Sequence, residues 1–249
     1  MPLIRVRRAG VDPSVVLRQR LTPDERARLD RAAPADRDAV ASVLLLARRA
    51  VAEACGVAPD AVRVRRRCPR CGSAAHGVPV ADRADGGPVP HVSLSRGGDL
   101  VVVALSDAGP VGVDVEPVRR TDDLARDGAG ARAGGGDELA RVVLAPGEPP
   151  AAGPHGLVRT WARTEAVLKA AGTGLAVDPR ALRVSDAAGR ADVRIVDPAA
   201  AAALAPAPGT RWWLTDLDVG ADHVAALAAL LPMSPSAPPA LDDRTFPLP

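Results

Sequence analysis

Asp114 and Glu116 lie two residues apart in the segment VGVDVE. On a strand this spacing places both carboxylates on one face, while Val113 and Val115 point the other way into a core. Two carboxylates on an otherwise apolar strand repel each other unless a cation lies between them. Oxygen ligands of this kind suit Mg²⁺, which proteins usually hold with one or two carboxylates, substrate phosphates and waters. A solvated edge strand with two surface acids is the alternative that this motif alone leaves open.

Glu165 and Lys169 lie four residues apart in WARTEAVLK, so a helix would present them on one face, with Trp161, Val167 and Leu168 supplying its buried side. Lys169 is the one lysine of the chain, beside 31 arginines. An ordinary helix-stabilising ion pair, worth about 0.3–0.5 kcal/mol, is the alternative. A carboxylate for a metal beside an ammonium for a phosphate is what phosphoryl chemistry needs, because its catalysis is mostly positioning and charge neutralisation.

Periodic segments on either side of these motifs predict the elements that position them. Helices are expected at 22–31, 35–54 and 156–172, and strands at 61–67, 100–106, 111–116, 181–186, 191–197, 211–219 and 223–231. The strands 100–106 and 111–116 flank a Gly/Pro turn and are expected to form a hairpin. The Gly-rich segment 121–138 is expected to be a mobile loop.

This order of elements predicts an α+β fold of two pseudo-symmetric halves, each a small, mostly antiparallel sheet packed against a long helix. The N-terminal half is expected at 1–116 and the C-terminal half at 117–231. The Pro-rich segment 232–249 is expected to be a disordered tail.

Composition excludes several classes of function. The net charge of +2 gives no reason to expect an anionic membrane or a nucleic acid as partner. No apolar run reaches the ~18 residues that span a bilayer, and MPLIRVRRAG lacks the apolar stretch of a signal peptide, so we expect a cytoplasmic protein. Three cysteines in a reducing compartment argue against a disulfide framework.

Cys68, Cys71 and His76 could supply three ligands of a zinc site, and the arginines around them could suggest a nucleic-acid module. No second C-x-x-C or H-x-H pair completes such a module, and the chain has almost no aromatic residues on which bases could stack. A solvated or phosphate-facing strand is therefore the favoured interpretation of the arginine run 63–70. Whether the three side chains bind a metal stays open.

The motifs together resemble the 4′-phosphopantetheinyl transferases. VGVDVEPV and WARTEAVLKAAGTGL are similar to the paired family signature (V/I)-G-(V/I)-D-h-E and W-x-x-K-E-x-h-x-K, in the same order. CPRCGSAAHGVP is similar to the family's C-x-x-C-G-x-x-H-G-K-P, VPHVSLSRGGDLVVVAL to its F-N-h-S-H segment, and RVVLAPGE to its helix ending in a glutamate. The likeness covers about residues 20–231. It is closest to the surfactin-synthetase-activating type, a single chain with two pseudo-symmetric halves.

The resemblance implies a reaction and a set of roles. The 4′-phosphopantetheine arm of coenzyme A would move to a serine of an acyl or peptidyl carrier protein, releasing 3′,5′-ADP. Asp114, Glu116 and Glu165 would hold Mg²⁺, Lys169 would contact the pyrophosphate, and Glu148 or Glu165 would act as the base. The expected coenzyme A ligands also include Ser95, Arg96, His76, Arg37 and Arg48. The enzyme would be a monomer.

Three positions depart from the family pattern. Arg96 replaces the histidine of the S-H pair, Val78 the lysine of H-G-K-P, and Thr164 the lysine before the motif glutamate. Arginine is always charged and can donate to a phosphate in place of histidine. The alternative function is a catalytically silent relative that binds coenzyme A or a carrier protein without transfer.

Overall fold

The computed structural model describes residues 2–118, 135–186, 188–233 and 238–248. The chain divides into two compact units, Met1–Val111 with Ser234–Pro249, and Gly112–Met233. No helix in these described ranges is long and apolar enough to cross a membrane.

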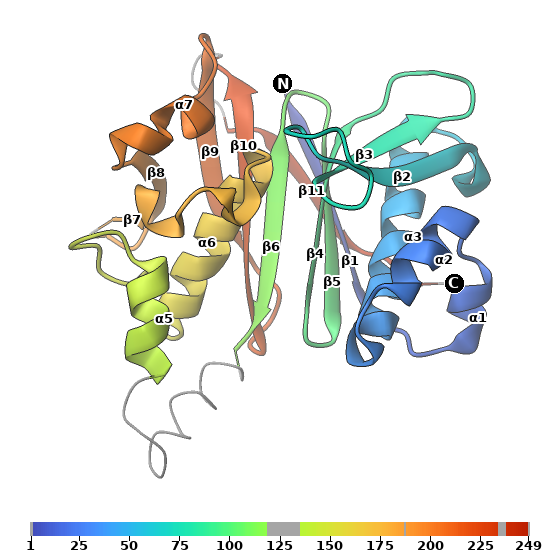
Figure 1. The fold of residues 1–249 in the computed structure, drawn as a ribbon, viewed down its shortest axis with the longest axis horizontal. Helices are drawn as coiled ribbons and strands as arrows, with labels where there is room; N and C mark the ends of the chain where they lie inside the picture. The colour runs from blue at the N-terminus through green and yellow to red at the C-terminus, as the bar shows by residue number, and fades with distance from the viewer. Residues whose placement is uncertain (1, 119–134, 187, 234–237, 249) are drawn as a thin grey trace. The chain divides into compact units, whose positions relative to one another are not determined.

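The first unit contains a four-stranded sheet in the order β11-β1-β5-β4 (Figure 1). Its strands are β1 (Leu3–Gly10), β4 (His91–Gly97), β5 (Leu100–Ser106) and β11 (Ala240–Thr245). The long helix α3 (Arg37–Cys55) packs its apolar side on this sheet, where Leu46 and Val51 meet Val101, Val103 and Leu105 in one buried cluster. Gly56 ends α3 in the left-handed conformation at φ 65°, as expected for a C-terminal glycine.

Shorter elements complete the first unit. They are α1 (Val15–Gln19), α2 (Pro23–Asp30), the antiparallel ribbon of β2 (Val62–Arg67) with β3 (Val78–Arg83), and 3₁₀ turns at Pro34–Asp36 and Pro59–Ala61. Helix α2 begins with the capping box that its sequence predicts, in which Thr22 and Glu25 each accept a hydrogen bond from the other's backbone N–H.

The second unit contains a three-stranded sheet in the order β6-β10-β9, covered by α6 (Gly156–Ala170) (Figure 1). The strands are β6 (Val111–Pro117), β9 (Thr210–Leu217) and β10 (His223–Pro232). Around them lie α5 (Gly135–Val143), the ribbon of β7 (Leu182–Ser185) with β8 (Ala191–Ile195), α7 (Ala201–Leu204) and 3₁₀ turns at Gly174–Ala176, Pro179–Ala181 and Pro198–Ala200.

The predicted helices and strands are confirmed, and the fold is mixed α+β with small, mostly antiparallel sheets. The predicted hairpin of 100–106 with 111–116 is wrong. Strand β5 already has a partner on each side, β1 and β4, so it offers no free edge to β6, which pairs with β10 instead. Most of the predicted mobile loop 121–138 falls outside the described residues, but residues 135–138 belong to α5.

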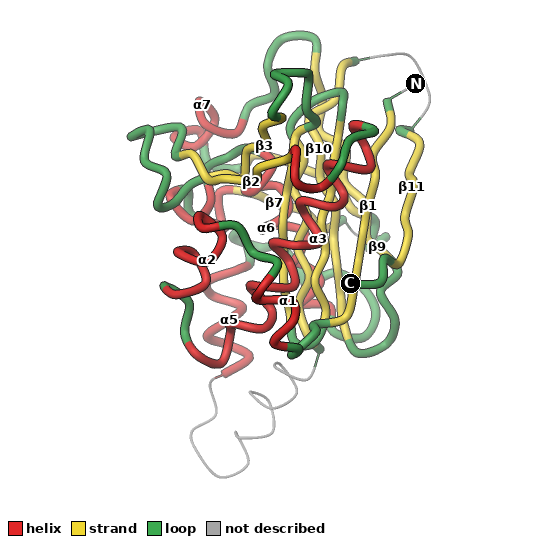
Figure 2. The backbone as a smooth tube through the Cα atoms, turned by 90° about the vertical axis from the view of Figure 1, so that its right-hand side faces the viewer, coloured by secondary structure: helices red, strands yellow, loops and turns green. Residues whose placement is uncertain are grey.

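The predicted disorder of 232–249 is also wrong for the segment 240–245. This segment forms β11, which pairs in parallel with β1 and runs beside it in Figure 2. Asp242 and Asp243 of β11 form ion pairs with Arg7 and Arg8 of β1, at 2.8 and 3.2 Å. Proline content is a local property, whereas this strand is held by partners more than 200 residues away, which local composition does not reveal.

Candidate functional site

Strand β6 and helix α6 approach each other closely because residue 112 is a glycine. A Cβ added to Gly112 would lie 1.9 Å from the backbone oxygen of Ala166 and 2.5 Å from the nitrogen of Ala170. The absence of a side chain therefore lets the backbone of α6 rest directly on β6. This contact places the second motif of the sequence against the first, within the second unit.

Asp114 is buried, with 3 % of its surface exposed, and Lys169 provides its cation. The Nζ atom of Lys169 lies 2.5 Å from Oδ1 of Asp114 and also donates to the backbone oxygen of Val113, at 3.2 Å. Val113 and Val115 point into the core and are fully buried, as predicted. The alternative of a solvated edge strand with two surface acids therefore does not hold for Asp114. Because a buried carboxylate is costly without a countercharge, Lys169 is more than a surface ion-pair partner.

Trp161, Glu165 and Lys169 recur every four residues on α6 and are half-buried, while the residues between Trp161 and Lys169 other than Glu165 are buried. Burial raises the pKa of the Glu165 carboxyl above its usual range; Lys169 opposes this rise and Asp114 adds to it. The influence of Asp114 on Glu165 indicates that the negative charges of the two motifs act on one another.

Glu116 accepts a hydrogen bond from Nε1 of Trp161 at 3.1 Å. The sequence interpretation assigned Trp161 to the buried side of the helix, which is wrong in this respect: the indole is half-buried and its N–H is directed to a site carboxylate. The four-residue spacing from Trp161 to Glu165 was the signal that could have placed the tryptophan on the site face.

The donors that β6 and α6 bring together are of the chemical kind that binds a divalent cation, but in the described part of the chain they do not converge as a group of three. Three carboxylates supply the hard oxygen ligands that Mg²⁺ prefers, and the ammonium of Lys169 stands where positive charge is needed beside Asp114. Asp114 is held by Lys169 and Glu116 by Trp161, so the carboxylates are drawn to these donors rather than to one common point. Binding of a cation would require Lys169 to share or release Asp114.

Glu148 has different surroundings. It follows α5 and is buried, with 5 % of its surface exposed. Its Oε1 accepts from the backbone N–H groups of Val184 and Ser185 at 2.8 and 3.1 Å, and its Oε2 accepts from that of Ala145 at 3.1 Å. The carboxylate thus joins the segment after α5 to strand β7. These hydrogen bonds favour a structural role for Glu148 in holding the two segments together. The sequence did not reveal this role because Val184 and Ser185 lie 36 and 37 residues away from Glu148.

The remaining predicted ligands of the cofactor lie in the first unit, where the structure gives them unequal environments. Arg48 is buried and contacts Glu25 at 3.4 Å and the backbone oxygen of Arg20 at 2.7 Å, so it is committed to the fold. Arg96 is exposed and contacts Asp36 at 3.4 Å. The other three are Arg37, half-buried at the start of α3, Ser95, buried on β4, and His76, exposed before β3.

A basic cavity of about 310 Å³ in the first unit contains arginines that the sequence analysis did not single out. Arg28 of α2, Arg31 at the C-terminal cap of α2, and Arg65 and Arg66 of β2 line it, together with the acids Asp24 and Glu25. Burial first, and then the charges of Arg66, Arg96 and Arg31, lower the pKa of Arg28 to about 10, while Glu25 opposes this shift. Burial followed by the charge of Arg96 also lowers the pKa of Arg66. An anion bound among these cations would relieve their mutual repulsion.

The position of Arg66 could have been inferred from its strand. Val62, Val64 and Arg66 alternate along β2 and share a face, whereas Arg63, Arg65 and Arg67 lie on the other and are exposed. The sequence analysis treated the arginine run 63–70 as one solvated or phosphate-facing strand and did not separate the inward Arg66 from its outward neighbours.

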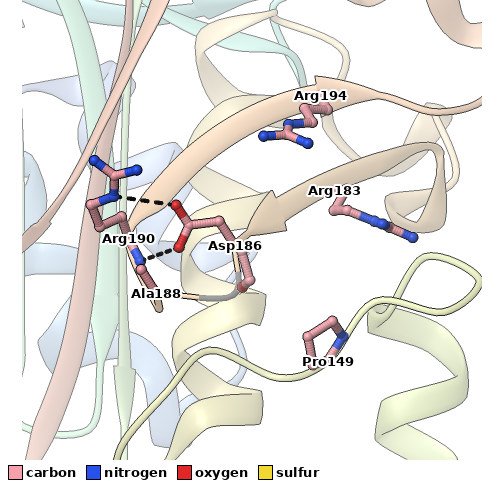
Figure 3. A pocket seen from close by; sticks show the side chains of 7 residues that line it. Pro149, Arg183, Asp186, Ala188, Arg190 and Arg194 are labelled. Carbon is pink, nitrogen blue, oxygen red and sulfur yellow. Dashed lines mark hydrogen bonds and ion pairs between the residues drawn. The ribbon is translucent and has the colours of Figure 1, made fainter.

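A second basic cavity, of about 470 Å³, lies in the second unit beside β7 and β8 (Figure 3). Arg183, Arg190 and Arg194 line it together with Asp186, which forms an ion pair with Arg190 at 3.3 Å. Arg183 donates to the backbone oxygen of Pro146 at 2.8 Å, so one of these arginines helps to hold the segment that carries Glu148.

Comparison with known proteins gives one family match. No curated protein is significantly similar to the chain. Residues 110–228 match the model of the 4′-phosphopantetheinyl transferase superfamily. The matched segment contains Asp114, Glu116, Glu165 and Lys169, together with Glu148. The match supports the 4′-phosphopantetheinyl transferase superfamily for the segment that carries this site.

Proposed function

We propose that the protein transfers 4′-phosphopantetheine from coenzyme A to a serine of an acyl or peptidyl carrier protein, with release of 3′,5′-ADP. The observation that carries the proposal is the buried Asp114, held at 2.5 Å by the one lysine of the chain, inside the segment that matches the superfamily. A purely structural ion pair would require neither a buried carboxylate nor the two further acids, Glu116 on β6 and Glu165 on α6. This arrangement suits a substrate that brings a pyrophosphate and a cation.

Asp114, Glu116 and Glu165 are the residues that would hold Mg²⁺. When bound, the ion would neutralise charge on the pyrophosphate, a contribution that dominates phosphoryl-transfer catalysis. Lys169 would then divide its hydrogen bonds between Asp114 and the pyrophosphate. Since the side chain of Lys169 is 27 % exposed while that of Asp114 is 5 % exposed, the ammonium is the member of the pair that a ligand can reach.

Glu165 is the better candidate for the base. The serine hydroxyl of the carrier protein forms a bond to the β-phosphorus, the bond from that phosphorus to the leaving 3′,5′-ADP breaks, and the serine proton passes to a carboxylate. Burial raises the pKa of Glu165, which makes it a stronger proton acceptor than an ordinary surface glutamate. Both oxygens of Glu148 already accept backbone hydrogen bonds.

The cavity of Arg28, Arg31 and Arg66 would bind the 3′-phosphate of coenzyme A, with Arg96 nearby. One guanidinium can donate two parallel hydrogen bonds to a phosphate, and the charges of Arg66, Arg96 and Arg31 all act on Arg28, so an anion would be attracted here in spite of the neighbouring Glu25. This assignment takes the place of Arg48, whose hydrogen bonds are used inside the unit. Ser95, His76 and Arg37 remain expected contacts.

The finer features of the family type belong to the same proposal. The chain would resemble the surfactin-synthetase-activating enzymes, with two pseudo-symmetric halves in a monomer. Each unit contains a sheet, one long helix packed on it and a separate two-stranded ribbon, which supports this idea.

Incubation with coenzyme A, Mg²⁺ and an apo carrier protein, followed by intact-mass measurement of the carrier, tests the function. We expect the carrier to gain one phosphopantetheine, and Asp114→Asn to abolish the gain. Asp178→Asn is a matched control, because Asp178 is an exposed acid of the same unit that pairs with Arg180. Equal activity of the two variants would contradict the assigned role of Asp114.

The silent relative gives a different pattern of results. It would bind coenzyme A in calorimetry but modify neither acyl nor peptidyl carrier proteins. Failure both to bind coenzyme A and to modify a carrier would reject the transferase proposal and the silent relative together.

A further inference from the structure

The loop between β2 and β3 brings three metal-ligating side chains together. Ligand atoms of Cys68, Cys71 and His76 all lie within 4.8 Å of one another. Sγ of Cys71 and Nε2 of His76 are 3.5 Å apart. Among the described residues, no other group of three or more His, Cys, Asp or Glu side chains converges in this way. The cluster lies outside the segment that matches the transferase superfamily.

The backbone of this loop folds into a tight turn around Cys68. The N–H of Gly72 donates to the oxygen of Cys68, and the N–H of Cys68 to the oxygen of Ser73, both at 2.9 Å. Gly72 has φ 72°, a conformation that favours glycine.

Gly77 explains how His76 reaches the cysteines. A Cβ added there would lie 2.4 Å from the oxygen of Arg67 and from the nitrogen and Cα of Cys68. Its φ of 102° is also one that other residues rarely adopt. The chain can therefore cross the backbone at Cys68 only with glycine at 77, and this crossing places the preceding histidine beside Cys71.

We propose that Cys68, Cys71 and His76 bind one Zn²⁺ ion. Two thiolates and an imidazole are soft and intermediate ligands that suit this metal, with Zn–S bonds of about 2.3 Å and Zn–N bonds of about 2.0–2.1 Å. Cys71 and His76 are exposed while Cys68 is buried, so the site opens to solvent and a water can take the fourth position. Coordination of both side chains to Zn²⁺ in a tetrahedral arrangement would replace the direct contact between Cys71 and His76.

The ion would fix one wall of the basic cavity. Ala74 and Ala75 lie between the ligands Cys71 and His76 and line the same cavity as Arg66. Arg66, which lines the cavity, also donates to the backbone oxygen of Gly77 at 2.6 Å, so a hydrogen bond also connects the loop, just after His76, to the cavity lining. Metal binding would thus stabilise the loop that forms this wall of the cavity. The metal site itself does not depend on the transferase proposal.

The experiment measures zinc in the full-length protein, purified under reducing conditions and then given one equivalent of Zn²⁺ and desalted. We expect one ion per chain in the wild type and background zinc in Cys68→Ser and Cys71→Ser. Cys55→Ser is the matched control, because Cys55 is the remaining cysteine and is not part of the cluster; it should keep one ion. With Co²⁺, the wild type and Cys55→Ser should show thiolate-to-cobalt absorption that the other two variants lose.

His76 is tested by its own pair of variants. His76→Ala should weaken zinc binding by more than the roughly 10- to 100-fold that removal of an outer-shell partner costs. His76→Cys should restore it, since cysteine supplies a ligand at the same place. Folding of each variant is checked by circular dichroism, so that metal loss in a folded protein is what counts.

Three outcomes would overturn the proposal. One is a wild type that retains no zinc and no cobalt absorption under these conditions, including the case in which Cys68 and Cys71 are found joined as a disulfide. Another is unchanged affinity in Cys71→Ser. The third is equal loss in Cys55→Ser, which would show nonspecific thiol binding.

Discussion

Replacement of Lys169 by methionine should destabilise the second unit far more than loss of a surface ion pair. Lys169 forms an ion pair with Asp114, whose side chain is 5 % exposed. Breaking a fully buried pair typically costs 3–5 kcal/mol because a charge remains buried without a partner, and partial exposure of Lys169, 27 %, reduces the expected loss to about 2–3 kcal/mol. Methionine keeps an unbranched side chain one atom shorter than lysine, and it removes the ammonium together with its hydrogen bonds to Asp114 and to the backbone oxygen of Val113.

Urea unfolding in EDTA measures this loss, with Arg180→Met as the matched control. Arg180 pairs with Asp178 at 2.8 Å, but both side chains are about half exposed, so this pair should contribute at most ~0.5 kcal/mol. The double variant Asp114→Asn/Lys169→Met should recover part of the loss, giving a coupling of roughly 1–3 kcal/mol. If Lys169→Met and Arg180→Met cost the same, the reasoning from burial is refuted.

Mg²⁺ adds a second measurement to the same variant. A cation held by Asp114, Glu116 and Glu165 can replace the missing ammonium, so Mg²⁺ at about 100 times its dissociation constant should stabilise the folded variant by about 2.7 kcal/mol. No stabilisation by Mg²⁺ in either the wild type or Lys169→Met would show that these carboxylates do not hold the ion.

Three further variants test the site and its supports. The pKa of the Glu165 carboxyl is raised on folding, so without divalent cations the wild type should lose stability as the pH rises through that pKa, and Glu165→Gln should lose less stability. Urea unfolding midpoints of both proteins across the pH range measure this difference. Parallel curves of midpoint against pH would contradict the assignment. Gly112→Ala should cost about 1–3 kcal/mol or more, because its Cβ would overlap the backbone of α6, and a wild-type melting temperature would refute that contact. Glu148→Ala should lower stability by about 2–4 kcal/mol, since three buried N–H groups lose their acceptor. Glu148→Gln keeps an acceptor and should retain transfer activity, measured by the mass of the carrier protein. A folded but inactive Glu148→Gln would instead favour Glu148 as the base.

Several features of the fold and site could be predicted because they depend on neighbours in the sequence. Alternation along VGVDVE gives the buried positions of Val113 and Val115, and four-residue spacing brings Glu165 and Lys169 to one face of α6. The ends of the helices follow from local chemistry as well, such as the capping box at Thr22.

Pairing between distant segments could not be predicted in the same way. The hairpin prediction failed because the neighbours of β5 are selected by the whole sheet, not by the turn that follows it. Strand β11 was missed because its ladder and ion pairs come from β1, at the other end of the chain.

The same division applies to the site residues. The sequence alone determined which residue types could meet on β6 and α6, because side-chain direction follows from backbone period. Only the tertiary structure decided that Asp114 is buried and paired with Lys169, that Trp161 donates to Glu116, and that Glu148 anchors backbone N–H groups. Burial and hydrogen bonding arise when segments far apart in the chain pack together, so the charge and reactivity of a carboxylate depend on contacts that its own neighbours do not encode.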